Sequence, residues 1–410
     1  MKQILHLLVA VVLLSCMCVP ASAYEDDLME AVNIHGFISQ GYLISGEYNY
    51  LTPNSKDGSF EYNEVGINFS KQLTDNLSMS VQLFSRDLGD VANNTVNLDY
   101  AYGDYRWRDW LGLRVGKIRV PIGLWNEVRD YDMLRPWVVL PQQRYNDLTR
   151  DAMVATNGVG IYGSLPAGAV GTFDYYLLTG IVNLDADQGY GKYMEGVLAG
   201  QAELDGDPEA DNMIAGSLRW QSPLPGLMLG ASAMKIGMLA HYNADYYGTP
   251  MQLDIDYDKL IIGYMAEYMW NDLSLWAEYF HEELNYTMSY RVNDTTGSYP
   301  ETEKEPEGYY IGAAYRFADW FQLGAYYSFG YNDAKDKDGD AMVEMGFSDH
   351  KGYQQDIALT FRFDLNEYAV LKIEGHQMQG TNLVVVTDNE DSDFSEEDWY
   401  YGAAKLTVSF

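Results

Sequence analysis

The last twelve residues, 399–410, read WYYGAAKLTVSF and alternate in character along the chain. One face of this stretch carries apolar or small side chains, which are Tyr400, Gly402, Ala404, Leu406, Val408 and Phe410. The other face is mostly polar and carries Tyr401, Ala403, Lys405, Thr407 and Ser409. Because successive side chains of a strand point to opposite sides, the alternation predicts a β-strand between an apolar and an aqueous environment.

The same two-residue period recurs along the whole chain and predicts sixteen strands. They are 32–45, 60–71, 76–86, 95–107, 109–119, 158–164, 171–182, 212–221, 227–240, 257–270, 272–285, 307–317, 321–332, 352–363, 367–380 and 398–410. Most cover the roughly 9–11 residues that a tilted strand needs to cross a membrane. In 95–107 we expect one face to hold Val96, Leu98, Tyr100 and Tyr102, and the other to hold Asn97, Asp99, Ala101 and Gly103.

The connections between these strands alternate between short and long. The short ones are 72–75, Arg108, 165–170, 222–226, Asn271, 318–320 and 364–367. The long, polar ones are 46–59, 87–94, 120–157, 183–211, 241–256, 286–306, 333–351 and 381–397. Transmembrane barrels have short periplasmic turns and longer outer loops. We therefore predict an all-β fold: a transmembrane antiparallel β-barrel of about sixteen strands over residues 32–410.

Tryptophans gather at the predicted turns, where Trp107, Trp110, Trp220, Trp270 and Trp320 are found. Amphipathic indole rings concentrate where a membrane meets water. We expect these five side chains, with the terminal Phe410, to lie at the membrane interface. No segment after residue 23 approaches the roughly 18 consecutive apolar residues of a transmembrane helix.

Residues 1–23 have the features of a secretory signal peptide: Lys2, an apolar run over 4–14, and Ala21-Ser22-Ala23 as a cleavage site. An alternative is a lipoprotein cleavage box at Leu14-Ser15-Cys16. Residues 24–31 would then form a short periplasmic segment before the barrel. Both cysteines, Cys16 and Cys18, leave with the signal, so the exported chain is expected to have no disulfide and no metal held by cysteine.

The exported chain is strongly acidic. Removing residues 1–23 takes away one lysine and no acid, which leaves 25 − 60 = −35. Nucleic-acid binding is not expected, because phosphate contacts need clustered cations. The predicted outer loops 183–211 and 381–397 are rich in acids. These acids either bridge divalent cations to lipopolysaccharide phosphates or form a solvated charged surface.

Together these features resemble those of the sixteen-stranded porins of the Gram-negative outer membrane. The last strand, which ends in Phe410, is similar to the terminal signal that the barrel-assembly machinery reads. The stretch GKIRVPIGLWNEVRDYDMLRP, residues 116–136, resembles the strand-to-loop passage of anion-preferring and phosphate-selective porins. The resemblance implies a homotrimer in the outer membrane, with the third outer loop folded into each lumen.

That third loop, 120–157, is long for a compact connection, and loops of this length are usually functional or disordered. Its apolar content argues against disorder, since Trp125 and Trp137 need burial. Folded inward, these rings could pack on the barrel wall while the charged groups line the remaining opening. The alternatives are a cap over the outer mouth or a contact between trimer subunits.

The third loop and its approaches also collect most of the arginines: nine of thirteen lie between Arg86 and Arg150. We predict that the loop and wall charges form the pore constriction and set its selectivity. The candidates are Arg86, Arg114, Lys117, Arg119, Glu127, Arg129, Asp130, Asp132, Arg135, Arg144, Asp147, Arg150 and Asp151. The alternative is that the arginines pair with neighbouring acids and hold the loop's shape. Alternation near Gly116 leaves open whether Lys117 and Arg119 face the water of the lumen or its rim.

Other chemistry has weaker support. The segment DKDGD, with Asp336, Asp338 and Asp340, has the ligand character of a calcium loop but lacks the full pattern. A catalytic barrel would need a serine and a histidine within reach, and His281 and Ser274 lie on opposite faces of one predicted strand. We therefore expect no enzyme and no cofactor; the alternative is a structural Ca²⁺ at the outer loops.

The sequence predicts an outer-membrane porin that passes small hydrophilic solutes and ions by passive diffusion, with a mild preference for anionic or zwitterionic solutes. Two alternatives remain open: a substrate-specific channel, for instance for phosphate or dicarboxylates, and a structural or adhesive barrel. The expected partners are the solutes, outer-membrane lipid and lipopolysaccharide.

Overall fold

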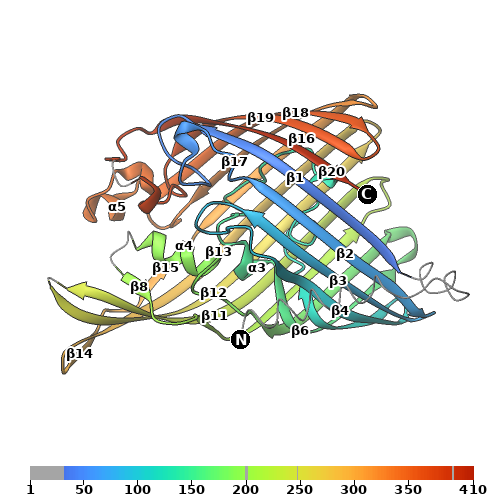
Figure 1. The fold of residues 1–410 in the computed structure, drawn as a ribbon. Helices are drawn as coiled ribbons and strands as arrows, with labels where there is room; N and C mark the ends of the chain where they lie inside the picture. The colour runs from blue at the N-terminus through green and yellow to red at the C-terminus, as the bar shows by residue number, and fades with distance from the viewer. Residues whose placement is uncertain (1–31, 199–201, 247, 390–391) are drawn as a thin grey trace, which may run out of the picture.

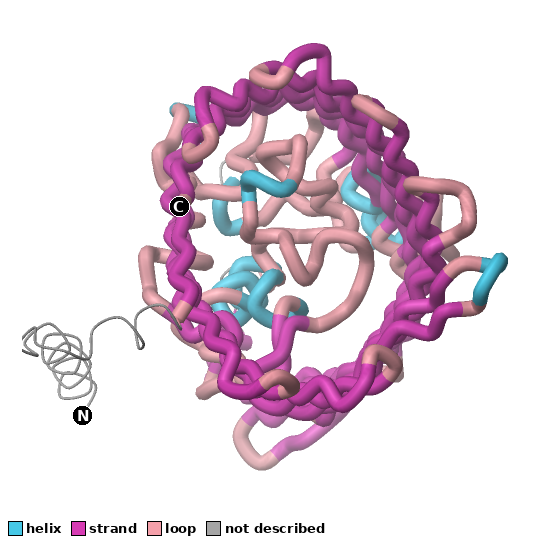
Figure 2. Tube along the Cα trace, turned by 90° about the vertical axis from the view of Figure 1, so that its right-hand side faces the viewer, coloured by secondary structure: helices cyan, strands magenta, loops and turns pink. Residues whose placement is uncertain are grey.

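The computed structural model describes residues 32–198, 202–246, 248–389 and 392–410. In these residues a single sheet closes on itself into a barrel, because the first strand pairs with the last (Figures 1 and 2). The predicted signal peptide 1–23, its lipoprotein alternative and the segment 24–31 lie outside the described residues. Among the helices that the structure describes, none combines the length and apolar character of a membrane-spanning helix.

Sixteen antiparallel strands form the wall, as the alternation predicted. They are β1 (Asn33–Ser45), β2 (Asn63–Thr74), β3 (Leu77–Asp87), β4 (Asn97–Arg108), β5 (Leu111–Arg119), β6 (Ala155–Pro166), β7 (Thr172–Ile181), β10 (Asn212–Gln221), β11 (Leu227–Tyr246), β12 (Thr249–Trp270), β13 (Leu273–Val292), β16 (Glu307–Ala318), β17 (Phe321–Tyr331), β18 (Tyr353–Asn366), β19 (Ala369–Gly380) and β20 (Asp398–Ser409). Each overlaps one predicted strand, and each pairs with its neighbours around the ring. The fold class and the strand number are confirmed.

Two predicted outer loops are largely strand, and here the prediction was wrong. In place of a loop over 241–256, β11 and β12 continue as a hairpin beyond the wall, with Tyr242 opposite Leu253. In place of a loop over 286–306, β13 extends to Val292 and pairs with β14 (Thr295–Ser298) and β15 (Thr302–Lys304). Two further short strands, β8 (Ala202–Leu204) and β9 (Glu209–Ala210), pair with β11. Figure 1 shows these strands projecting from one end of the barrel.

The helices in the described part of the chain are short, and most lie in the outer loops. They are α3 (Arg150–Met153), α4 (Tyr190–Val197), α5 (Asp340–Glu344), η1 (Ser55–Asp57), η2 (Asp132–Leu134), η3 (Gly168–Val170), η4 (Asp349–Gly352) and η5 (Thr387–Asn389). Both η2 and α3 belong to the third loop, which begins after β5 and ends before Ala155 of β6. The third loop is therefore residues 120–154.

The two faces of each strand meet different surroundings, and β20 shows this clearly. Leu406 and Val408 point outward and are exposed, whereas Lys405 and Thr407 point into the barrel and are buried. An apolar exterior around a polar interior is the arrangement that a membrane-spanning barrel requires. The prediction for the last strand is confirmed.

Aromatic side chains lie at the tight-turn end of this apolar exterior. Four of the predicted interface tryptophans, Trp107, Trp110, Trp270 and Trp320, are exposed at the tight-turn end, and Phe410 is exposed beside them. There the fifth, Trp220, donates its indole N–H to the carbonyl of Val170 at 2.7 Å. One row of neighbouring outward rings also runs obliquely across four strands and comprises Tyr264, Tyr279, Tyr309 and Phe329. This row was not expected from the sequence.

A β-bulge in β4 changes which of its residues face the lumen, so the predicted faces of this strand were wrong. Gln82 of β3 pairs with Tyr100 but Leu83 pairs with Leu98, so Asp99 is an extra residue in the ladder. An extra residue reverses the alternation beyond it. Tyr100 therefore faces the lumen, where its hydroxyl lies 3.0 Å from that of Tyr131 in the third loop. We expected Tyr100 and Tyr102 to share the face of Leu98, and they do not.

The apolar band generates a test of membrane insertion. Ile373 is outward and exposed near the middle of β19, whereas Leu365 is outward at the turn end of β18. We expect Ile373→Arg to lower the free energy of unfolding by about 2–4 kcal/mol and the control Leu365→Arg by about 0–1 kcal/mol. Guanidinium unfolding of protein refolded into phospholipid vesicles measures both. Equal losses would contradict a lipid-facing band at this position.

Candidate pore constriction

The third loop lies inside the barrel and packs against its inner wall. Figure 2, a view along the barrel, shows loop segments filling much of the ring of strands. Trp137 is fully buried, and its ring centroid lies 5.2 Å from that of Trp276 on β13 and 5.4 Å from that of Tyr326 on β17. The indole N–H of Trp125 donates to the hydroxyl of Tyr310 at 2.8 Å. The rings that the sequence required to be buried therefore use the barrel wall, not an outer cap.

Two buried wall glutamates hold the loop backbone. Glu374 on β19 accepts the amide N–H groups of Val138 and Val139, each at 2.8 Å. Glu278 on β13 accepts the amide of Leu124 at 3.0 Å and the hydroxyl of Tyr145 at 2.5 Å. Hydrogen bonds to a charged acceptor are stronger than those between neutral groups. Neither residue was expected from the sequence, where the only signal was an acid on the inward face of a strand.

A third anchor joins the loop to the strands that close the barrel. Asp132 is buried, with Lys372 of β19 at 3.0 Å and Lys405 of β20 at 3.8 Å. Arg135 of the loop lies 3.6 Å from the same carboxylate, and Thr407 donates its hydroxyl at 2.8 Å. A buried carboxylate among three cations is stable only because these partners replace water.

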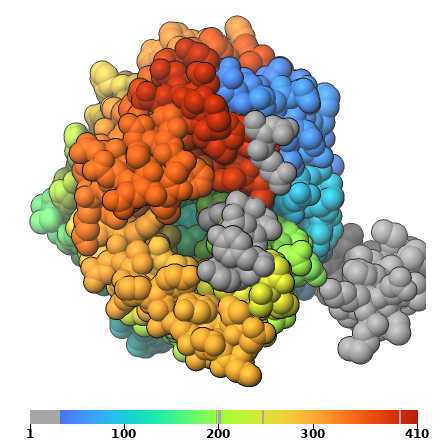
Figure 3. Space-filling model, turned by 90° about the vertical axis from the view of Figure 1, so that its left-hand side faces the viewer, coloured from blue at the N-terminus to red at the C-terminus, as the bar shows by residue number. Residues whose placement is uncertain are grey.

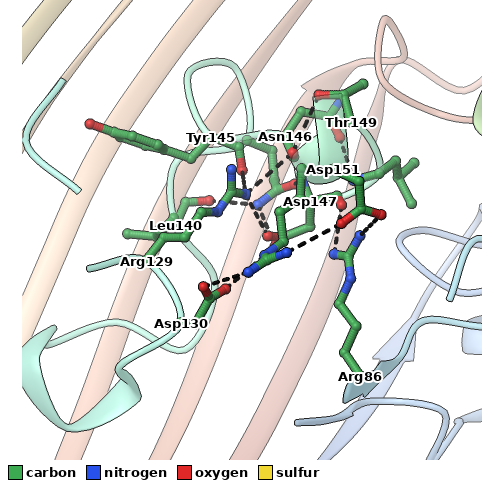
Figure 4. A network of polar contacts seen from close by, with 12 residues as sticks. Arg86, Arg129, Asp130, Leu140, Tyr145, Asn146, Asp147, Thr149 and Asp151 are labelled. Carbon is green, nitrogen blue, oxygen red and sulfur yellow. Dashed lines mark hydrogen bonds and ion pairs between the residues drawn. The ribbon is translucent and has the colours of Figure 1, made fainter. Parts of the chain in front are cut away.

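The remaining arginines pair with acids of the loop and of β4. Arg150 reaches Asp130 at 2.6 Å and Asp99 at 2.7 Å, and Arg119 of β5 pairs with the same two carboxylates. Figure 4 shows the adjoining contacts. There Arg129 donates to Asp147 at 2.8 Å and to the carbonyl of Tyr145 at 2.9 Å. Arg86 donates to the carbonyl of Asp147 at 2.7 Å and pairs with Asp151 at 3.4 Å.

These contacts divide the predicted constriction residues into two groups. The buried group is Arg86, Arg119, Arg129, Asp130, Asp132, Arg135 and Arg150, together with the side chain of Arg144, which lies 3.4 Å from Glu278. The group that retains contact with water is Arg114, Lys117, Glu127, Asp147 and Asp151. For the buried group, pairing that holds the loop's shape accounts for every contact described here. A role in selectivity stays a prediction, and it concerns the second group.

Two ion pairs that keep contact with water involve the wall from β4 to β10. Arg114 pairs with Asp104 at 2.7 Å, and its guanidinium lies 4.6 Å from the ring centroid of Tyr162. Arg219 of β10 pairs with Glu127 of the third loop at 3.0 Å and so links loop to wall. Arg114 faces the lumen as predicted. Arg219 and Asp104 were missed, although alternation places Arg219 on the polar face of its strand beside Ser217 and Gln221.

The two basic residues whose orientation was open behave differently. Arg119 is buried in the loop network, whereas Lys117 is half-buried and donates to the carbonyl of Leu98 at 2.6 Å. Gly116, between them and Arg114, has a φ of +133°. A side chain there would lie 2.2 Å from the carbonyl oxygen of Ala101, so the position requires glycine. The unusual backbone at this point explains why simple alternation could not orient the two cations.

A cavity of about 610 Å³ lies on the outer side of the third loop, and we call it the outer vestibule. It is enclosed by the third loop, α4, the upper parts of β11 to β13, and the outer segments around α5 and residues 382–386. A second, more polar cavity of about 360 Å³ lies between β3, β5 and α4 and includes Lys117 and Asp151 in its lining.

The acidic outer segments show no metal cluster in the part of the chain that the structure describes. Asp336 accepts the amide N–H groups of Asp340 and Ala341 at 2.9 and 3.0 Å, so its carboxylate serves the start of α5. The calcium loop expected at Asp336, Asp338 and Asp340 therefore lacks a converging ligand set among these residues.

Asp132→Asn tests whether the buried ion pairs hold the loop. The change keeps the side-chain shape but leaves Lys372, Lys405 and Arg135 without their shared carboxylate, and we expect a loss of about 3–5 kcal/mol in the free energy of unfolding. Asp151→Asn is the control, because Asp151 is partly exposed and its arginine partners keep other acceptors. There we expect under about 1 kcal/mol. Denaturant unfolding measures both, and indistinguishable variants would refute the anchor.

Comparisons with known proteins agree with this geometry. No protein-family model and no curated protein matches the sequence. Among solved structures, the chain is similar to OmpT of Vibrio cholerae, with a TM-score of 0.58 and 12% identity over 92% of this chain and 97% of that one. It is similar to OmpF of Salmonella typhi, with a TM-score of 0.55 and 12% identity over 92% and 97% of the two chains. An anion-selective porin from Comamonas acidovorans gives a TM-score of 0.53 and 13% identity over 93% and 99%.

Identities this low establish the fold and not the activity. The closed ring of sixteen strands, the apolar exterior and the infolded third loop are features of this structure that do not depend on these neighbours. The chain therefore has the fold of the sixteen-stranded outer-membrane porins of Gram-negative bacteria.

Proposed function

We propose that this protein is a porin, a water-filled channel in the outer membrane of a Gram-negative bacterium through which small hydrophilic solutes and ions diffuse. One observation carries the proposal: the third loop is fixed inside the lumen by buried ion pairs, while the side chains of Arg114 and Asp104 on the wall stay in contact with water. A sixteen-stranded barrel without such a loop is a wide aqueous channel. The loop narrows it and brings charges close to a passing solute.

Transport of this kind involves no chemical step, and we propose none. Selection follows from the width of the gap and from the water-facing charges, chiefly Arg114, Arg219 and Glu127. The ion pairs Arg114–Asp104 and Arg219–Glu127 are each close to neutral overall. We therefore propose that any preference for anionic or zwitterionic solutes is mild. A homotrimer is part of the proposal, and one solved structure of OmpT of Vibrio cholerae is a trimer form.

The first prediction concerns conduction itself. Purified protein refolded in detergent and added to a planar lipid bilayer should produce stepwise, ohmic increases in current, because a continuous water-filled path carries both ions of the salt. A sample of the same chain denatured before addition is the control. A folded barrel that inserts and carries no current would favour the alternative of a structural or adhesive barrel.

The second prediction concerns the charge at the gap. Arg114→Glu changes the lumen by two unit charges, and at about 8 Å in water this disfavours an anion by about 1 kcal/mol and favours a cation by about as much, so the anion-to-cation permeability ratio should fall roughly thirtyfold. Lys235→Glu is the matched control, because Lys235 lies on the outer face of β11 and its side chain is 63% exposed.

The reversal potential under a salt gradient reports both changes, and the effect should shrink at high salt. A clear cation preference in the unmodified protein that Arg114→Glu leaves unmoved would discard the anion preference while leaving the channel intact.

A further inference from the structure

The outer vestibule has the size of a ligand site. Its volume of about 610 Å³ falls within the roughly 300–1,000 Å³ of sites that enclose small organic molecules. Figure 3, a view onto the outer loops, shows a hollow between them on this face. A solute approaching the third loop from outside would enter this space first.

The walls of the vestibule are unusually apolar for the interior of a porin, which is generally polar. Aromatic rings come from several elements, including Tyr190 and Tyr193 of α4, Tyr257 of β12 and Phe280 of β13. The rings of Tyr190 and Tyr193 stack with centroids 6.0 Å apart, and the hydroxyls of Tyr190 and Tyr257 lie 2.8 Å apart. Flat faces held in this way suit a flat apolar ligand.

The side chains that line the vestibule carry a net positive charge, whereas the whole protein is negative. Five lining side chains are cationic and one is anionic: Arg129, Arg144, Lys259, Lys304 and Lys351 against Glu282. The whole chain, by contrast, carries −34. Three of the cations have a carboxylate partner: Arg129 lies 2.8 Å from Asp147, Arg144 3.4 Å from Glu278, and Lys259 2.6 Å from Glu282.

The other two cations, Lys304 and Lys351, form no ion pair within the residues that the structure describes. The ammonium of Lys351 donates to the carbonyls of Thr381 at 2.9 Å and Val384 at 2.6 Å. Burial lowers the pKa of Lys351 to about 8, so this ammonium is still mostly charged near pH 7, and burial also lowers the pKa of Lys304. Both side chains are half-buried. A cation that has lost part of its water and has no counter-ion is disfavoured, and a bound anion would offset that cost.

We propose that the outer vestibule binds aromatic carboxylates, with the ring against the tyrosines and the carboxylate at Lys304 and Lys351. The combination of apolar walls and unpaired cations selects this class, because a small hydrophilic anion would leave the rings unused and a neutral aromatic would leave the lysines unpaired. The inference deepens the proposed channel function and rests on it for its consequence, which is enrichment of such solutes above the third loop.

Binding is measured on the full-length exported chain, refolded in detergent, by isothermal titration calorimetry. Benzoate is the probe, with acetate and benzyl alcohol as the anionic and the neutral comparison. We expect benzoate to bind about tenfold or more tightly than either, a difference of about 1.4 kcal/mol. Equal binding of benzoate and acetate, or of benzoate and benzyl alcohol, would overturn the proposal.

Two variants separate the two halves of the site. Lys304→Gln should weaken benzoate about tenfold, whereas Lys335→Gln should not, because Lys335 is half-exposed and lies outside the vestibule. Tyr190→Leu keeps both lysines and should abolish a preference for benzoate over cyclohexanecarboxylate. Unchanged benzoate affinity in Lys304→Gln, or no preference for benzoate over cyclohexanecarboxylate in the unmodified protein, would refute the assignment.

The same samples are then tested in planar bilayers, so that the two proposals can fail separately. Conduction without benzoate binding would refute the vestibule site and leave the porin function standing. Benzoate binding without conduction would support the vestibule site and refute passage through the barrel.

Discussion

Closure of the sheet is the constraint on which the rest of this structure depends, because lipid offers no hydrogen bonds to an open strand edge. β1 and β20 meet it by pairing from Phe37 with Ser409 to Ser45 with Tyr401. The same closing strand directs Lys405 and Thr407 into the lumen, where both contact Asp132 of the third loop. Thr407 also lies within 2.8 Å of the hydroxyl of Ser39 on β1. The strand that closes the barrel therefore also holds the third loop in place through Lys405 and Thr407.

The third loop shows how charged groups can fix a segment inside a barrel that is otherwise open to water. Its tryptophans supply apolar contact with β13 and β17, but its position is set by carboxylates and cations that find partners only in one arrangement. A purely apolar loop could slide over the wall at little cost, whereas shifting Asp132 or Asp130 would leave several buried cations unpaired. The cations that crowd this part of an acidic chain are explained by that requirement before any role in selectivity.

The outer loops carry mainly negative charge on their exposed surface and mainly positive charge on the side that faces the vestibule. Acids dominate the exposed segments, while the cations that face the cavity exceed the acids there. Low-dielectric walls strengthen the field of enclosed charges, so a few lysines in the cavity can outweigh a larger number of hydrated carboxylates outside. The extension of β11 and β12 beyond the wall forms part of the cavity lining. Alternate residues of this extension, such as Ile255 and Tyr257, point into the cavity.

Sequence alone determined the sixteen strands, the side of each turn and loop, and the lipid and lumen faces of strands such as β20, because these follow from alternation between neighbouring residues. It also identified the third loop as a segment that needs burial. Tertiary structure decided which charges meet. Glu278, Glu374 and Arg219 approach the loop from strands far away in the chain, and the bulge at Asp99 turned Tyr100 inward. Local periodicity carries no information about partners across a lumen, since those are set by the register and curvature of the closed sheet.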